Sequence, residues 1–278
     1  MSTQSFTKQE SPLLVGVVRE KTERAAIAAI RNCEYHGATG IDLHLSCLER
    51  EFQTEECFAR IISQTRLPIM ALNYNQTYDY QQFDTDEESR IEMLKMFVRA
   101  GGAAVDMQGY SYDLPSKLAF RQEFAHMPYS FIRDNPKEIV VDPAVIEKQK
   151  SLIEWVHSMG SEVVISTHPW VPMNCEQVVD LARFLEERNP DGIKIVTPCE
   201  NDDQLAEAFK TMLMLKKEVK ATVHFHCCGK AGSLSRIINP ILGGYLIFCS
   251  DGYSESSNFE QLDLVTAKSI MDGIKKIQ

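Results

Sequence analysis

The stretch Asp191-Gly192-Ile193-Lys194-Ile195-Val196-Thr197-Pro198 combines the pattern of a buried strand with a lysine in its middle. A short β-branched apolar run that follows a turn-like Asn-Pro-Asp-Gly segment and ends at a proline predicts a strand. Lysine is rarely buried, because removing an ammonium group from water is costly unless the group is paired or loses its proton. A neutral lysine amine is a nucleophile that forms a Schiff base with a carbonyl. The alternative is a lysine at a strand end whose charge reaches water or a carboxylate.

Strand-like and helix-like segments alternate on both sides of this stretch. The expected strands are residues 13–18, 40–46, 68–73, 103–108, 162–168, 191–198, 221–226 and 245–249. The expected helices are residues 22–36, 51–64, 86–100, 144–158, 176–187, 203–216, 229–239 (with its turn) and 261–276. Eight such units predict an α/β fold, a single (β/α)8 TIM barrel, because alternation implies parallel strands with helical crossovers. The rival, an open doubly wound sheet, lacks a Gly-rich dinucleotide fingerprint after the first strand.

The expected barrel is a catalytic domain of residues 13–278, preceded by a polar N-terminal tail at 1–12. An excursion at 109–143, rich in aromatic residues, interrupts the alternation and ends in the strand-like segment 138–141. In a TIM barrel the active site lies at the carboxyl ends of the strands, so a conspicuous polar residue there indicates chemistry.

Composition restricts the class of partner and the compartment. The chain has 278 residues, of which 44% are hydrophobic and 24% charged, enough for one large domain with a substantial core. Its formal net charge of −10, with no Lys/Arg-rich run, argues against nucleic acid or an anionic membrane as the main partner. No apolar run approaches the length of a membrane span. The eight cysteines are scattered without paired spacing and no signal peptide is recognisable, so we expect reduced thiols and a cytoplasmic location.

His168 ends the predicted strand next to the one that carries Lys194. A histidine in that position is suited to act as general acid and base beside a lysine imine. The alternative for His168 is a histidine whose ring is satisfied by backbone groups at the strand end. The presence of His168 and Lys194 on adjacent strands favours the catalytic interpretation.

Two further strands carry polar residues at a spacing of two, which places each pair on one face of its strand. These pairs are Asp42 with His44, and His224 with His226. Imidazole and carboxylate groups suit zinc or manganese. No second carboxylate stands at a convincing position, so a metal site is the less favoured interpretation, and histidines hydrogen-bonded to their neighbours are preferred.

A glycine-containing turn, Gly229-Lys230-Ala231-Gly232-Ser233-Leu234-Ser235-Arg236, follows the predicted strand 221–226. Glycines before a helix allow close approach of the backbone, and the helix N-terminus favours an anion. Arg236, one turn into the segment, is placed to hold a carboxylate with two parallel hydrogen bonds.

With these residues the chain resembles the type I 3-dehydroquinate dehydratase family, over roughly residue 13 to the C-terminus. The family's imine lysine matches Lys194, and its Ser-x-His strand end matches Ser166 to His168. Its Gly-x-x-Gly-x-x-Ser-Arg turn, whose arginine holds the substrate carboxylate, matches Gly229 to Arg236, and its closing loop matches Ser257 to Gln261. The resemblance implies a cofactor-free hydro-lyase of the shikimate pathway that works through a covalent lysine imine, with Lys194 and His168 as catalytic residues and Arg236, Ser257 and Gln261 as substrate-binding residues.

Other positions depart from the family pattern. The family's Glu-x-Arg-x-Asp on the second strand is Asp42-x-His44-x-Ser46 here, and its arginine at the end of the third strand falls at Asn73. The aspartate after the catalytic histidine is Pro169, and the two methionines of the seventh strand fall at His226 and Cys228. The resemblance therefore assigns Asp42, His44, Asn73 and His226 to substrate binding, in a pocket rewritten around the substrate hydroxyls.

The resulting hypothesis is a Schiff-base carbon–oxygen lyase that acts on 3-dehydroquinate or on a related hydroxylated keto-acid, with a small molecule as its partner and a homodimer compatible with it. The rewritten pocket predicts that 3-dehydroquinate is a poor substrate; the competing possibility is that His44 and Asn73 replace the arginines. Three alternatives from other classes stay open. They are a class I aldolase, a metal-dependent barrel enzyme that uses Asp42, His44, His224 and His226, and a non-catalytic paralogue that binds a metabolite.

Overall fold

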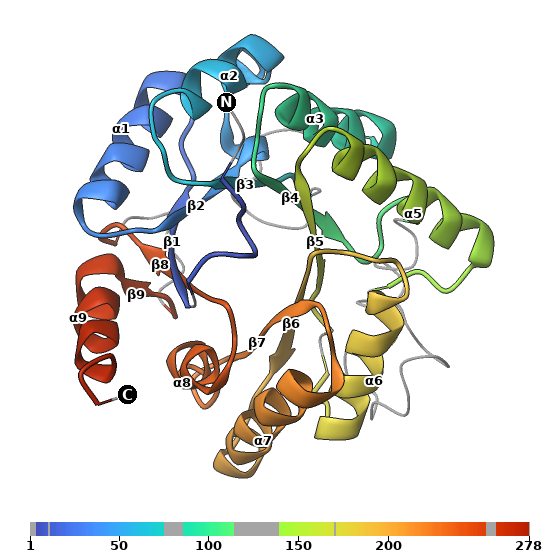
Figure 1. Ribbon diagram of the computed structural model, residues 1–278, viewed down its shortest axis with the longest axis vertical. Helices are drawn as coiled ribbons and strands as arrows, with labels where there is room; N and C mark the ends of the chain where they lie inside the picture. The colour runs from blue at the N-terminus through green and yellow to red at the C-terminus, as the bar shows by residue number, and fades with distance from the viewer. Residues whose placement is uncertain are drawn as a thin grey trace. The chain divides into compact units, whose positions relative to one another are not determined.

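The computed structural model describes residues 4–10, 12–74, 86–113, 139–169, 171–253 and 260–277 (Figure 1). The chain divides into two compact units. The first unit comprises Met1–Asp106, Met159–Ser161 and Leu246–Gln278, and the second comprises Met107–Ser158 and Glu162–Tyr245.

The first unit holds parallel strands in the order β4-β3-β2-β1-β8-β9. The strands are β1 (Leu13–Val18), β2 (Gly40–His44), β3 (Ile69–Leu72), β4 (Ala104–Gln108, which runs into the second unit), β8 (Leu246–Ser250) and the short β9 (Leu262–Asp263). The helices are α1 (Glu23–Tyr35), α2 (Glu55–Ile62), α3 (Glu87–Arg99) and α9 (Leu264–Ile274), with 3-10 turns at Leu45–Cys47 and Arg50–Phe52.

The second unit holds parallel strands in the order β5-β6-β7. They are β5 (Glu162–Thr167), β6 (Gly192–Pro198) and β7 (Thr222–Cys228). The helices are α5 (Pro143–Ser158), α6 (Cys175–Glu186), α7 (Asp202–Glu218) and α8 (Ser235–Leu242). Figure 1 shows α6 and α7 side by side along the strands that they follow and precede.

The predicted alternation of parallel strands and helices is confirmed, with β9 as an addition. Local sequence signals explain most of the agreement. Strands β1 to β8 are mostly apolar and buried along most of their length. Six helices begin at a side chain that accepts a hydrogen bond from the first helical turn, at Thr22, Thr54, Asp86, Asn174, Asn201 and Asp263. Predicted and observed ends differ by a few residues, as expected of frayed helix ends.

The strand-like interpretation of 138–141 is wrong for its described residues. Ile139 and Val140 are buried, yet they form no strand. The backbone N–H of Val140 donates to the carbonyl oxygen of Gly109 (2.9 Å), and its own carbonyl accepts from Nη2 of Arg188 (2.6 Å). Because these contacts satisfy the buried backbone groups, no pairing with another strand is needed.

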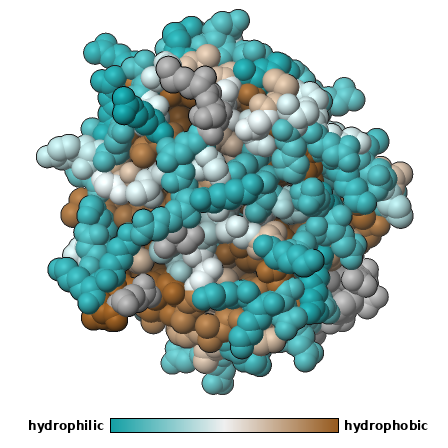
Figure 2. All heavy atoms as spheres, viewed as in Figure 1, coloured by the Kyte–Doolittle hydropathy of each residue, from teal (hydrophilic) through white to brown (hydrophobic). Residues whose placement is uncertain are grey.

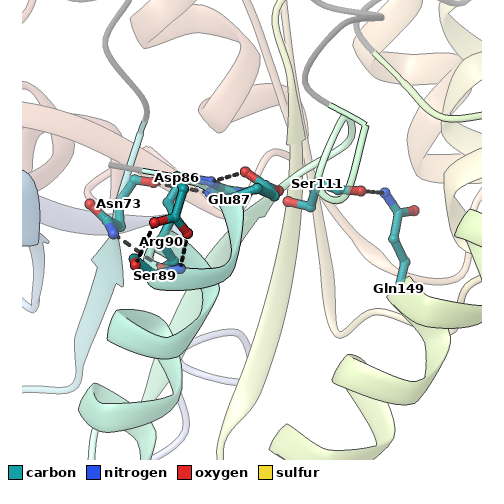
Figure 3. A network of polar contacts seen from close by, with 7 residues as sticks. All are labelled: Asn73, Asp86, Glu87, Ser89, Arg90, Ser111 and Gln149. Carbon is teal, nitrogen blue, oxygen red and sulfur yellow. Dashed lines mark hydrogen bonds and ion pairs between the residues drawn. The ribbon is translucent and has the colours of Figure 1, made fainter. Parts of the chain in front are cut away.

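Arg188 and Gln149 hold both ends of the 109–143 excursion in the second unit. Nε2 of Gln149 donates to the carbonyl oxygens of Gly109 (3.0 Å) and Ser111 (2.9 Å), the second contact being visible in Figure 3. Nε of Arg188 donates to Oε1 of the same glutamine (2.7 Å), and burial lowers the pKa of the guanidinium to about 10. The rest of the excursion, residues 114–138, lies outside the described part of the chain.

The predicted polar tail is partly packed. Phe6 is fully buried beside Gly40, and Thr7 is buried as well. These side chains extend the apolar core of the first unit into the segment 4–10.

The surface carries mostly polar side chains on the face that Figure 2 shows, with smaller apolar patches between them. None of the helices in the described ranges is both long enough and apolar enough to cross a membrane.

Candidate active site

Lys194 lies within β6 in the second unit, and the residue is 7% exposed. In the strand register it stands between Ser166 of β5 and His224 of β7. Register partners on parallel strands point to the same face of the sheet, so these three side chains share one face. The predicted burial of Lys194 is therefore observed, and its neighbours on both sides are polar.

His168 and Arg236 belong to the same unit as Lys194, and both act electrostatically on His226. The pKa of His226 is far below the ordinary value, chiefly because the ring is buried and then because of Arg236, His224, Lys194 and His168. Positive charges nearby disfavour the protonated ring. His168 directly follows β5 and is half-buried. The residues Lys194, His168, Arg236, His224 and His226, which all belong to the second unit and are linked by these electrostatic effects, are here called the basic cluster.

The turn between β7 and α8 sets the position of Arg236. Gly229 has a φ of +86°, which favours glycine. Oγ of Ser235 accepts from the backbone N–H of Cys227 (2.7 Å) and donates to the carbonyl oxygen of Gly232 (2.6 Å), so it ties the start of α8 to the end of β7. Arg236 follows in the first turn of α8, and the residue is 9% exposed. A guanidinium held in this way is suited to a carboxylate.

In the first unit, the predicted residues Asp42 and His44 form a buried pair on β2, with 3.4 Å between Oδ2 and Nε2. Oδ1 of Asp42 has no hydrogen-bond partner among the described residues. The ring of Tyr74 meets that of His44 edge to face, with 6.4 Å between the centroids, and its hydroxyl donates to Oδ2 of Asp106 (3.4 Å). Sequence reasoning missed Tyr74 and Asp106. The signal for Asp106 was present, because a buried carboxylate in an apolar strand is the same kind of anomaly as Lys194.

Asn73 fastens the end of β3 to α3. Its Nδ2 donates to the carbonyl oxygen of Arg90 (3.1 Å), and Nη1 of Arg90 donates back to the carbonyl oxygen of Asn73 (3.0 Å). Arg90 is fully buried, and its Nε and Nη2 both bind the carboxylate of Glu87 at 2.8 Å (Figure 3). The side-chain nitrogen of Asn73 is thus engaged by the fold, whereas its Oδ1 has no hydrogen-bond partner in the described ranges.

The predicted closing segment is seen only in part, because Ser257 lies outside the described residues. Gln261 is buried in the first unit, where its Oε1 accepts from Oγ of Ser250 (3.4 Å) and its carbonyl oxygen accepts from the hydroxyl of Tyr253 (2.8 Å).

The histidines considered as metal ligands contact each other. Nδ1 of His226 lies 2.7 Å from Nε2 of His224, a hydrogen-bond distance, so these two nitrogens share one proton. Within the described ranges, no group of three or more His, Cys, Asp or Glu side chains has the arrangement of a metal site.

A cavity of about 360 Å³ lies elsewhere in the first unit, between α1 and the ends of β1 and β8. Its polar lining includes Arg19, Glu20, Asn32 and Asp251. It contains none of the residues that the sequence assigned to the active site.

Comparisons with known proteins agree with one another. A family model described as Type I 3-dehydroquinase matches residues 17–277. The 3-dehydroquinate dehydratase of Coxiella burnetii is 27% identical over 125 residues, which cover 44% of this chain and 52% of that enzyme, so the match spans about half the length of this relative. The crystal structure of 3-dehydroquinate dehydratase from Geobacillus kaustophilus aligns with a TM-score of 0.74 and 11% identity, over 96% of this chain and 92% of that one. A type I 3-dehydroquinate dehydratase from Clostridium difficile, solved with covalently modified comenic acid, aligns with a TM-score of 0.73 and 13% identity over 97% and 95% of the two chains. The structural neighbours confirm the predicted barrel fold class.

Proposed function

Since the chain belongs to the type I 3-dehydroquinase family, we propose that it is a hydro-lyase that dehydrates a hydroxylated keto-acid through a covalent imine on Lys194. The observation that carries the proposal is the basic cluster, in which a buried lysine of β6 lies one strand away from the histidine that follows β5, and both act electrostatically on His226 together with an arginine of α8. A cytoplasmic location is part of the proposal and is supported by the eight cysteines, which are all thiols.

The proposed reaction begins when the amine of Lys194 attacks the ketone and water leaves, which gives an iminium ion. The positive iminium acidifies the neighbouring C–H bond, and His168 removes that proton. The electron pair of the C–H bond forms the new double bond as the β-hydroxyl departs, protonated by His168. Water then hydrolyses the imine, which releases the unsaturated keto-acid and restores the lysine.

Arg236 is proposed to bind the carboxylate of the substrate. An arginine offers two parallel N–H groups to a carboxylate, and burial strengthens the contact because water competes less. Ser257 and Gln261 are proposed to join it, as the resemblance implies.

As the resemblance implies, Asp42, His44, Asn73 and His226 are proposed as the residues that bind the substrate hydroxyls. Imidazole and amide groups are shorter than guanidinium groups and lack their fixed charge. We therefore propose that a keto-acid with a different hydroxyl pattern is a better substrate than 3-dehydroquinate. The engagement of the Asn73 amide nitrogen by the carbonyl of Arg90 supports this reading, since that nitrogen is already used.

Borohydride trapping tests the imine. The protein is incubated with a panel of cyclic keto-acids and borohydride, and the adduct is located by mass spectrometry. The adduct should lie on Lys194, disappear in Lys194→Ala and persist in the control Lys230→Ala, which removes an exposed lysine of the neighbouring turn. Labelling on Lys230, or no labelling with any keto-acid, would refute the proposed function.

A dehydration assay on 3-dehydroquinate, followed by the absorbance of the enone, decides the substrate. A kcat/KM of about 10⁴ M⁻¹s⁻¹ or above is within the ordinary range for enzymes and would make 3-dehydroquinate the substrate. A rate lower by several orders of magnitude, with Lys194 still trapped by another keto-acid, would support the altered substrate.

A further inference from the structure

The rings of His224 and His226 form a hydrogen-bonded pair on one face of β7. Their facing nitrogens, Nε2 of His224 and Nδ1 of His226, are 2.7 Å apart, and the ring centroids are separated by 4.8 Å. The residues are 1% and 3% exposed, so bulk water does not compete for this contact. One nitrogen of the pair must donate and the other must accept. The hydrogen bond therefore links the tautomers of the two rings.

His226 is the member of the pair that nearby basic groups hold in its neutral form. Burial, followed by Arg236, His224, Lys194 and His168, holds the pKa of His226 far below its ordinary value, so the ring is uncharged near neutral pH. A neutral imidazole has one N–H group and one lone pair, and the positive charge of Arg236 favours a lone pair on the nitrogen that is not bound to His224. This places the proton on Nδ1, which donates to His224, and leaves Nε2 as an acceptor.

The environment of His224 is suited to fixing this arrangement. In the register His224 is the partner of Lys194, one strand away. The ring of Tyr245 meets it edge to face, with 6.3 Å between the centroids and an interplanar angle of 87°. A packed ring has little freedom to rotate, so its Nε2 keeps pointing at His226.

We propose that His224 is a positioning residue that holds His226 as a neutral hydrogen-bond acceptor for a hydroxyl group of the substrate. The role rests on the dehydratase function proposed above and defines its specificity. A buried group that expects an O–H donor loses its hydrogen bond when the ligand lacks that hydroxyl, and this loss is the strongest way in which a pocket rejects an analogue. The pair would thus select hydroxylated keto-acids over their deoxy analogues.

The tautomer is tested first, on the ligand-free protein. Nitrogen NMR of histidine-labelled protein separates a protonated ring nitrogen from one with a lone pair. The resonances of His226, assigned by their loss in His226→Gln, should show a protonated Nδ1 and an unprotonated Nε2. The opposite tautomer, or a charged ring near neutral pH, would overturn the proposal without any bearing on the reaction at Lys194.

The functional test compares His224→Phe with the conservative variant His224→Gln. Phenylalanine removes the acceptor, whereas the amide oxygen of glutamine can still accept from Nδ1 of His226. With a keto-acid that traps on Lys194, His224→Phe should raise KM by about tenfold or more, while the KM of the deoxy analogue should stay near that of wild type. His224→Gln should have a KM for the hydroxylated acid that is close to that of wild type.

Borohydride trapping of both variants separates the two proposals. If the wild-type protein forms no adduct, the proposed function is refuted. The predicted tautomer of His226 is tested separately by NMR. If trapping persists and His224→Phe raises KM equally for the hydroxylated acid and its deoxy analogue, His224 only supports the fold. The positioning role is then refuted.

Discussion

Gly232 is the position in the turn before α8 where a single added carbon should disturb both stability and binding. A Cβ placed there would lie 2.7 Å from Cβ of Cys227, 2.8 Å from the carbonyl oxygen of Cys228 and 2.9 Å from Cβ of Cys199. Optimal contacts between carbon atoms are about 3.5–4.0 Å. All three atoms belong to the backbone or to the first carbon of a side chain, so rotation of a side chain cannot remove the overlap.

The change Gly232→Ala should therefore force the turn to move. Overpacking of this kind costs typically about 1–3 kcal/mol, and three simultaneous overlaps place Gly232→Ala in the upper part of that range. For a chain of this size a loss of about 2–3 kcal/mol lowers Tm by roughly 4–10 °C. Arg236 follows the turn closely and depends on Ser235, which donates to the carbonyl of Gly232. KM for a carboxylate substrate should rise as well.

The matched control is Gly273→Ala in α9. Apart from its chain neighbours and the backbone of its own helix, no heavy atom of the described chain lies within 4 Å of a Cβ at this position. Alanine in a helix should stabilise the protein by about 0.5–1 kcal/mol relative to glycine. Urea denaturation and calorimetry measure both variants. If Gly232→Ala unfolds at the same urea concentration as the wild type, the close packing of the turn is not what requires glycine, and the reasoning is refuted.

Three further changes test the site and the fold. His168→Ala should reduce turnover by about 10²–10⁴-fold and allow the imine adduct to accumulate, because a positioned acid–base group has been removed; unchanged turnover would exclude His168 from the mechanism. Arg236→Ala should weaken the binding of carboxylate substrates by about 1.5–3 kcal/mol and leave the binding of their esters nearly unchanged. Equal losses of binding for acid and ester would mean that Arg236 only stabilises the fold. Asp263→Ala should destabilise the protein by about 0.5–2 kcal/mol at pH 7, because Asp263 caps α9 through the backbone N–H of Thr266 (3.0 Å). The hydrogen bonds from Thr266 lower the pKa of Asp263 in the folded protein. The stabilisation by Asp263 is therefore complete above the ordinary carboxyl pKa and is lost as the pH falls through the lowered pKa of the folded state. If the difference in unfolding free energy between wild type and Asp263→Ala does not narrow below about pH 4, this reasoning is contradicted.

Much of the fold could be predicted because its signals are local. A β-branched run predicts the strand around Lys194. Capping residues predict where helices begin to within a few residues, as at Thr22, Asp86 and Asn174. The segment 138–141 was wrongly predicted as strand-like. The carbonyl oxygen of Val140 accepts a hydrogen bond from Arg188, which is far away in the sequence, and no periodicity of the sequence reveals such a contact.

In the candidate site, too, some features could be predicted from the sequence and others could not. A spacing of two places His224 and His226 on one face, and the structure shows them there. We expected histidines hydrogen-bonded to their neighbours, but spacing cannot give the rotation of a ring, so it did not identify His224 and His226 as each other's partners. Asn73 was assigned by position alone, and its amide is instead bound to the carbonyl of Arg90, a contact that depends on where α3 packs.

The basic cluster also predicts how ligands stabilise the protein. Burial and then Arg236 lower the pKa of His226, so a further positive charge is repelled there. An anion that enters the cluster offsets this repulsion, and a ligand that binds only the folded state stabilises it by about 2.7 kcal/mol at a concentration of 100 Kd. A cyclic hydroxy-acid without a ketone cannot form the imine, so it isolates this electrostatic effect. It should raise Tm in wild type, and its methyl ester should not. Arg236→Ala should lose most of the shift, whereas Lys230→Ala, which removes an exposed positive charge of the turn, should keep it. Equal shifts with the acid and the ester would mean that the cluster does not bind the carboxylate.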